Sequence, residues 1–279
     1  MRYQWGMTTH VAAIWPLRAL ARPKLLAVAS IGVLAAAGWM YLGLMLAGMS
    51  GIGLLEALCR PNFGISGAGT AQGAVVFGMW CAMTLAMMMP TAAPMILTYA
   101  ELAEKAACKG ERAASPLVLM AGYIGVWLAA IVALSALQLI LTQLALLDPA
   151  LASASPLFSG AVFMGAGAYQ FSALKQACVT QCQHPFRFFF ANWTSEPGGV
   201  FRLGVQQGLY CLGCCWAMML LMFALGVMNV IWMAALGAVM AIEKINTTTR
   251  FSRALGVLFI LVGAAFVVSS FAAHWPRAG

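Results

Sequence analysis

Charged residues are scarce in this sequence. Only 8% of its 279 residues are charged, and 63% are hydrophobic, whereas soluble domains carry about 25% charged residues. A water-soluble fold of this size needs a polar surface, and this composition cannot supply one. We therefore exclude a soluble fold and predict an integral membrane protein, because a lipid bilayer accommodates the excess apolar surface.

Acidic residues and histidines are also few, with seven Asp and Glu residues and three histidines. Hard cations such as Mg²⁺ and Ca²⁺ are bound by oxygen ligands, so the composition argues against a carboxylate-rich metal site. The sequence has no phosphate-binding loop, no glycine-rich dinucleotide motif, no hydrolase nucleophile elbow and no HExxH pair. Nothing in it indicates an organic cofactor, a nucleic-acid partner or a defined enzymatic reaction.

Long apolar segments are abundant. A membrane-spanning helix needs about 20 mostly apolar residues, and seven segments meet or nearly meet this requirement. We predict an all-α fold, a polytopic membrane helical bundle of about seven transmembrane helices within residues 25–272, flanked by tails at 1–24 and 273–279. The sixth segment is short and forms a tight hairpin with the fifth, unless the two merge. The predicted helices cover residues 25–48, 72–100, 116–145, 157–175, 203–224, 228–243 and 252–272.

The basic residues between these segments predict an orientation. In the seven-helix arrangement, 13 of the 15 Lys and Arg residues fall on one side, and only Arg60 and Arg277 fall on the other. Basic residues are enriched in cytoplasmic loops. We therefore expect a multi-pass protein of the cell (inner) membrane, in contact with lipid, with a cytoplasmic N-terminus and an outside C-terminus.

Soft sulfur ligands are the chemistry that the sequence does supply, with eight cysteines and 19 methionines. Cys211, Cys214 and Cys215 are spaced i, i+3 and i+4, so on a helix their side chains face one direction. Free cysteine is often simply a small buried hydrophobe. Three cysteines within five residues favour a functional site over that alternative.

Two further groups contain candidate ligands. Cys178 and Cys182 share a helix face if the fourth predicted helix continues to them, and His184 follows closely. Cys and His ligands suit zinc, and copper is also compatible. Met87, Met88 and Met89 precede Pro90 in the second predicted helix, which Pro90 and Pro94 should kink. Thioethers suit Cu(I), although membrane methionines are commonly plain filler.

Topology places these candidates at a similar depth. The cytoplasmic half of the predicted bundle contains Cys211–Cys215, the Cys178–His184 segment and Met87–Met89. Polar and ionisable groups at membrane depth are functional candidates. We therefore predict one shared site, with a Glu243–Lys244 ion pair fixing the adjacent hairpin.

These motifs resemble the predicted metal-binding integral membrane proteins known as domain of unknown function 2182. The resemblance covers roughly residues 70–250. It is carried by Met87–Met95, by Cys178-xxx-Cys182-xx-Pro185 and above all by Gly208–Trp216, continuing to Glu243-Lys244. Many members have His where this sequence has Gln207, and Arg where it has Gln183. The resemblance implies metal binding and membrane location, and it implies no reaction.

Our first hypothesis is a metal-binding membrane protein for a soft ion, copper or zinc. Cys211, Cys214 and Cys215 would be the core ligands, Cys178, Cys182 and His184 would close the site, and Met87–Met89 would form a second sulfur layer or a path. A metal donor or another membrane protein would be its partner. Two alternatives remain open: a membrane thiol oxidoreductase, and a transporter or assembly factor without bound metal.

Overall fold

The computed structural model describes residues 23–47, 70–147, 153–227 and 229–274. The predicted tails lie almost wholly outside these ranges, as do Cys59 and Arg60. The described ranges are helical and contain no β-strand, which confirms the all-α prediction. The helices are α2 (Pro23–Ala47), α4 (Thr70–Cys108), α5 (Pro116–Gln143), α6 (Pro156–Tyr169), α7 (Ala173–Gln183), α8 (Pro185–Ala191), α9 (Pro197–Leu225), α10 (Val230–Ile245) and α11 (Thr249–His274).

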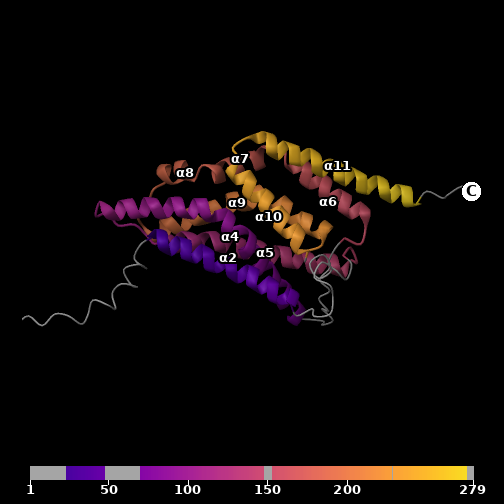
Figure 1. The fold of residues 1–279 in the computed structure, drawn as a ribbon, viewed down its shortest axis with the longest axis horizontal. Coiled ribbons are helices and arrows are strands. Elements are labelled where there is room, and N and C mark those ends of the chain that lie inside the picture. The colour runs from indigo at the N-terminus through magenta and orange to yellow at the C-terminus, as the bar shows by residue number, and fades with distance from the viewer. Residues whose placement is uncertain (1–22, 48–69, 148–152, 228, 275–279) are drawn as a thin grey trace, which may run out of the picture.

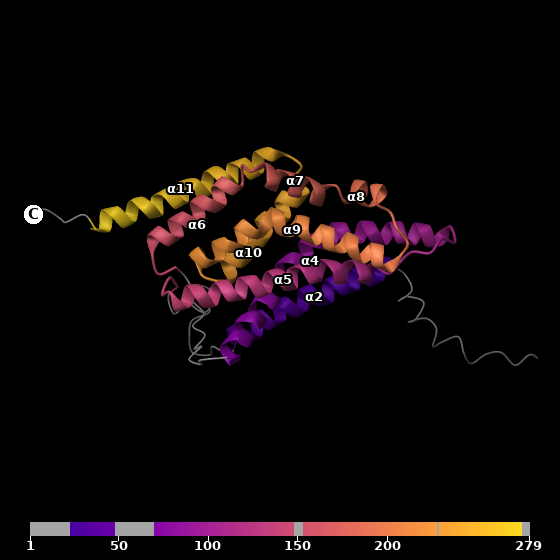
Figure 2. The same cartoon turned by 180° about the vertical axis from the view of Figure 1, so that it is seen from behind.

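The long helices run back and forth along the longest axis of the molecule (Figures 1 and 2). Helices α4, α5 and α9 lie in the middle of the bundle, α2 covers one side, and α6 with α11 covers the opposite side. Each long helix is mostly apolar. Its side chains are buried against neighbouring helices or lipid when the helices lie side by side in this way. Because successive long helices run in opposite directions, α7, the end of α10 and the last part of α4 lie toward the same end of the molecule (Figures 1 and 2).

Within the described residues, five helices are long and apolar enough to cross a membrane, namely α2, α4, α5, α9 and α11. A bent pair, α6 and α7, would be a sixth span if the two helices together cross. Helix α10 has only 16 residues, which is short for a span. The number seven is therefore not confirmed, whereas a multi-pass helical membrane bundle is compatible with these helices.

The predicted continuous helix over 157–175 is wrong. Helix α6 ends at Tyr169 and α7 begins at Ala173, with a bend of 64° between them. The cause is local: the Ser172 side chain accepts a hydrogen bond from the Lys175 backbone N–H, which caps a new helix. Cys178 and Cys182 consequently lie on a separate short helix, one turn apart.

Helix α4 passes through Pro90 and Pro94 without interruption, and it changes direction midway along its course (Figures 1 and 2). Each proline removes one intrahelical hydrogen bond, so a bend is expected there. The Thr91 hydroxyl donates to the Met88 carbonyl and the Thr98 hydroxyl donates to the Pro94 carbonyl. The bend turns the methionine segment toward α9.

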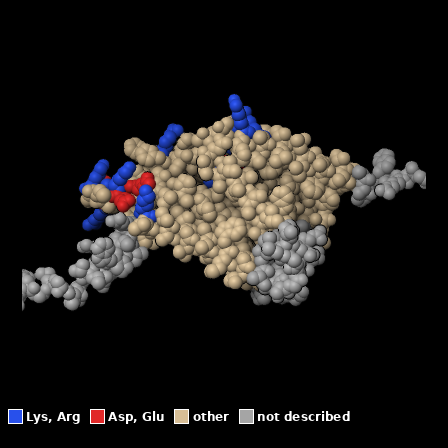
Figure 3. All heavy atoms as spheres, in the orientation of Figure 1, with Lys and Arg blue, Asp and Glu red and all other residues tan. Residues whose placement is uncertain are grey.

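Charged side chains gather at one end of the face that Figure 3 shows. This end contains the last turns of α4 and the start of α5, and further basic side chains stand above α8 and the start of α11. The opposite end of this face shows no charge on described residues. The segregation agrees with the predicted pattern of basic loops, and it does not by itself say which end faces the cytoplasm.

Candidate metal centre

Three cysteines of α9 form a compact sulfur cluster. The Sγ atoms of Cys211, Cys214 and Cys215 all lie within 4.8 Å of one another, and all three residues are buried. Their i, i+3, i+4 spacing brings them to one face of the helix, as predicted. Thiolates on a tetrahedral metal with bonds of about 2.3 Å lie about 3.8 Å apart, so small side-chain rotations would bring the three sulfurs around one ion. We call these residues the three-cysteine cluster.

Two thiols of the three-cysteine cluster, those of Cys214 and Cys215, are hydrogen-bonded within α9. Cys214 Sγ donates to the Cys211 carbonyl at 3.1 Å, and Cys215 Sγ donates to the same carbonyl at 2.8 Å. A metal ion binds the deprotonated sulfur, so its binding would release these protons. The hydrogen bonds orient the Cys214 and Cys215 thiols toward the same carbonyl.

A fourth sulfur reaches the cluster from α4. The Met88 Sδ atom lies 4.0 Å from Cys215 Sγ, and Met88 is completely buried. Its neighbours differ in position: Met87 packs against Gly237 of α10, and Met89 is buried in the apolar core. Of the three predicted methionines, Met88 is the one that the structure brings to the three-cysteine cluster.

The two cysteines of α7 also lie against α9. The Cys178 sulfur occupies the space where a side chain at Gly213 would begin, because a Cβ there would be 2.6 Å from it. Cys182, one turn later, is partly exposed and lines a cavity together with Cys211 of α9. His184 is not brought to the cluster, because it lines a separate cavity of about 450 Å³ beside Arg187. All seven described cysteines are free thiols.

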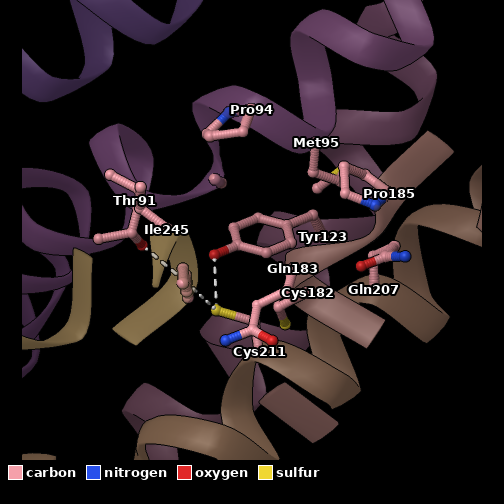
Figure 4. Close-up of a pocket in the computed structure, with 12 residues that line it drawn as sticks. Thr91, Pro94, Met95, Tyr123, Cys182, Gln183, Pro185, Gln207, Cys211 and Ile245 are labelled. Atoms are coloured by element: carbon pink, nitrogen blue, oxygen red, sulfur yellow. Dashed lines mark hydrogen bonds between the residues drawn. The ribbon is translucent and has the colours of Figure 1, made fainter. Parts of the chain in front are cut away.

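Lys244, which we predicted to pair with Glu243, lies beside the three-cysteine cluster. Its Nζ donates to Cys211 Sγ at 3.1 Å and to Thr91 Oγ1 at 2.8 Å. The Tyr123 hydroxyl lies 3.1 Å from the same sulfur (Figure 4). Cys211 therefore has a cation and a phenol as polar neighbours.

The predicted Glu243–Lys244 ion pair is wrong. Glu243 Oε2 accepts a hydrogen bond from Lys175 Nζ at 2.8 Å, and both side chains are at most 2% exposed. Adjacent residues on a helix point about 100° apart, so Glu243 and Lys244 cannot face each other. Gln183 adds a second link between α7 and α10, since its amide donates to the backbone carbonyls of Glu243 and Asn246.

A cavity of about 260 Å³ opens onto the cluster (Figure 4). Among the described cysteines, only Cys182 and Cys211 line it, whereas Cys214 and Cys215 are buried and are not among its lining residues. The buried amide nitrogen of Gln207 also borders the cavity and has no hydrogen-bond partner in the described structure. The complete lining is Thr91, Ala92, Pro94, Met95, Tyr123, Cys182, Gln183, Pro185, Gln207, Cys211, Lys244 and Ile245.

Comparison with known proteins adds one finding. A family model described as PpoB2, copper chaperone, matches residues 77–266, a range that includes the three-cysteine cluster, α7 and Met88. No curated protein and no solved structure matches the sequence. The match supports the copper-related part of the sequence prediction, and the label domain of unknown function 2182 stays a prediction.

Proposed function

The chain belongs to the PpoB2 copper chaperone family, and we propose that it binds one Cu(I) ion within the membrane and passes it to another protein. The observation that carries this proposal is the three-cysteine cluster, with three buried Sγ atoms within 4.8 Å of one another. A fourth sulfur, from Met88, lies 4.0 Å from Cys215. Copper is thus the substrate of the protein.

The donor set favours copper over zinc. Thiolates bind both ions, but a thioether suits Cu(I), whereas zinc sites are completed by further Cys, His or carboxylate ligands. His184 lines another cavity, and the donor that reaches Cys215 from another helix is the Met88 thioether. A thioether is a good ligand for Cu(I), so Met88 distinguishes the two ions.

Charge balance supports the same assignment. A Cu(I) ion bound by three thiolates carries a net charge of about −2, and an uncompensated buried charge is costly. The ammonium group of Lys244, 3.1 Å from Cys211 Sγ, offsets part of that charge. It forms no ion pair with Glu243, which is paired with Lys175.

The proposed resident ligands are Cys211, Cys214, Cys215 and Met88. This set is narrower than the sequence prediction. Cys178 is outside it because its sulfur packs against Gly213, and Met87 is outside it because it packs against α10. Met89 and His184 have no place in the resident set either.

The proposed setting is the inner membrane, with the start of α9 facing the cytoplasm and the three-cysteine cluster near the middle of that helix. Five long apolar helices are compatible with a multi-pass protein, and the gathering of basic residues at one end supports this orientation. The proposed partners are a cytoplasmic thiol carrier of Cu(I) as donor, a copper-requiring protein as acceptor, and the surrounding lipid.

The test is Cu(I) binding by the full chain purified in detergent. Titration against a coloured Cu(I) chelator, with elemental analysis after desalting, should give one copper per chain. C211S/C214S/C215S should lose it, and M88L, which keeps the volume of the side chain, should bind copper about tenfold more weakly. C108S is the matched control, because Cys108 is exposed at the end of α4.

Substoichiometric copper in the wild type, or unchanged copper in C211S/C214S/C215S, would reject the proposal. The thiol oxidoreductase alternative predicts instead a disulfide among the same cysteines after oxidation. Alkylation of oxidised and reduced samples, read by mass spectrometry, distinguishes the two functions. We expect all seven described thiols to be alkylated in the unfolded protein after both treatments.

A further inference from the structure

We propose that Cys182 and Cys211 form a transient Cu(I) loading site, which shares Cys211 with the resident site and differs from it by Cys182. At this site the incoming ion is held by one cysteine from α7 and one from α9 before it reaches Cys214 and Cys215. The inference rests on the proposed function and adds to it the route and the class of donor. The donor would be a soluble thiol compound or protein that holds Cu(I) as a dithiolate.

The cavity geometry carries the inference. Of the five cysteines that α7 and α9 contribute, only Cys182 and Cys211 line the 260 Å³ cavity (Figure 4). Cys182 is partly exposed, while Cys211, Cys214 and Cys215 are buried. An ion that enters through this cavity therefore meets Cys182 and Cys211 before it meets Cys214 and Cys215.

Cys182 is also positioned to hand the ion onward. It lines the cavity together with Cys211, which belongs to the three-cysteine cluster, so it lies beside the buried cluster and faces the cavity at the same time. Cys178 differs, because its sulfur packs against Gly213 and does not border the cavity. The two cysteines of one short helix thus have different surroundings, and only Cys182 links the cavity to the cluster.

Charge favours an anionic donor. The cavity is lined by the Lys244 side chain, and no carboxylate is among its described lining residues. A Cu(I) ion held by two carrier thiolates has a net charge of −1 at the metal, so the Lys244 ammonium attracts it. The polar Tyr123 hydroxyl and Gln207 amide also line the cavity and can bond to the carrier.

The transfer is a series of balanced thiol exchanges without any change in oxidation state. Cys182 forms a bond to copper, one carrier sulfur leaves, and the Cys182 proton passes to that sulfur. Cys211 displaces the second carrier sulfur in the same way, which releases a second neutral carrier thiol. Cys214 then displaces Cys182 and returns a proton to it, so Cys182 ends as a free thiol. Cys215 binds last as a thiolate, and its proton leaves to solvent.

The experiment measures loading rate and equilibrium binding separately. Full-length protein in detergent is mixed with the Cu(I) complex of glutathione, and Cu(I)–thiolate absorption in the ultraviolet is followed with time. C182S should keep the wild-type copper stoichiometry and load at least about tenfold more slowly, because a transient bond that lowers the barrier is lost. C108S should load at the wild-type rate.

C178S controls for loosened packing of α7 and should slow loading less than C182S does. An equal delay in C178S would assign the effect to helix α7 as a whole and overturn the loading site. A wild-type loading rate in C182S would overturn it as well. Loss of copper in C182S would make Cys182 a resident ligand, which also contradicts the inference.

A second readout uses the wild-type protein. After loading, Cys182 should remain reactive toward a small alkylating reagent, while the three-cysteine cluster becomes protected. Equal protection of Cys182 would contradict the transient role. If the wild type binds no copper at all, the proposed function itself fails, so the two failures are told apart.

Discussion

Two helix contacts, α2–α4 and α7–α10, each contain an ion pair of nearly the same length in different surroundings. Lys24 and Glu101 are 2.7 Å apart and about half exposed. Lys175 and Glu243 are 2.8 Å apart and at most 2% exposed. Exposed pairs contribute little to stability because water screens them, whereas removing one partner of a buried pair leaves an uncompensated charge.

The two contacts also differ in backbone packing. Helices α2 and α4 approach closely at Gly38, where a Cβ would lie 2.7 Å from backbone atoms of Ala82 and Ala86. The short helix α7 touches α10 mainly through polar groups: Lys175 with Glu243, and Gln183 with two carbonyls. We infer that close backbone packing fixes α2 on α4, while buried polar bonds fix α7 over the three-cysteine cluster.

The largest expected effect is at the buried pair. K175M leaves Glu243 buried without its cation, and we expect a loss of about 3–5 kcal/mol in the free energy of unfolding. Denaturant unfolding in detergent, followed by tryptophan fluorescence, measures this loss. K175M/E243L removes both charges and should recover most of the stability. If the double variant is as unstable as K175M, the pair is not held by charge compensation.

The close approach at Gly38 gives the second largest effect. G38L forces α2 away from Ala82 and Ala86, and overpacking of this kind costs about 1–3 kcal/mol. Copper stoichiometry should stay at the wild-type value, because α2 contributes no ligand to the proposed site. G32L is the matched control, since a side chain at Gly32 meets no neighbouring atom within 4 Å in the described structure. Equal destabilisation by the two variants would contradict this interpretation.

The Gln183 link should have a smaller effect. Q183L removes two hydrogen bonds to the end of α10, and we expect a loss of about 1–2 kcal/mol. Faster hydrogen exchange at the last amides of α10 would locate the loss there. Unchanged stability and unchanged exchange would show that water replaces the amide fully, and that Lys175 alone holds α7 on α10.

The exposed pair should have the smallest effect. K24M removes the cation next to Glu101 at an exposed site, so the unfolding midpoint should match that of the wild type, at both low and high salt. A clear loss of stability that disappears in high salt would show that α2 depends on this pair. The α2–α4 and α7–α10 contacts would then both depend on an ion pair and differ only in how much stability it contributes.

Much of the fold follows from composition and spacing. Runs of about 20 apolar residues predict the long helices, and i, i+3, i+4 spacing predicts the convergence of Cys211, Cys214 and Cys215. Both features are determined by residues that are close together in the sequence. The break at Ser172 is also local, but a serine among apolar residues gives a weak signal until its side chain is seen to cap α7.

The partners of the lysines depend on tertiary structure. Lys175 meets Glu243 and Lys244 meets Cys211 across helix contacts that join residues 68 and 33 positions apart, and neither contact follows from periodicity. One local signal was available, since adjacent residues on a helix do not face each other. That rule excludes a Glu243–Lys244 pair and leaves two side chains that need other partners.

The position of the three-cysteine cluster along α9 has an electrical consequence. Cys211 lies 14 residues after Pro197 in a 29-residue helix, about 21 Å along its axis and near its midpoint. In the proposed membrane setting, a charge at this depth senses about half of the transmembrane voltage, or ~1 kcal/mol per unit charge for 100 mV. Replacing thiol protons with one Cu(I) changes the charge of the site by −1 for two thiolates and by −2 for three. The voltage dependence of copper affinity in sealed vesicles would therefore count the thiolates that bind the ion.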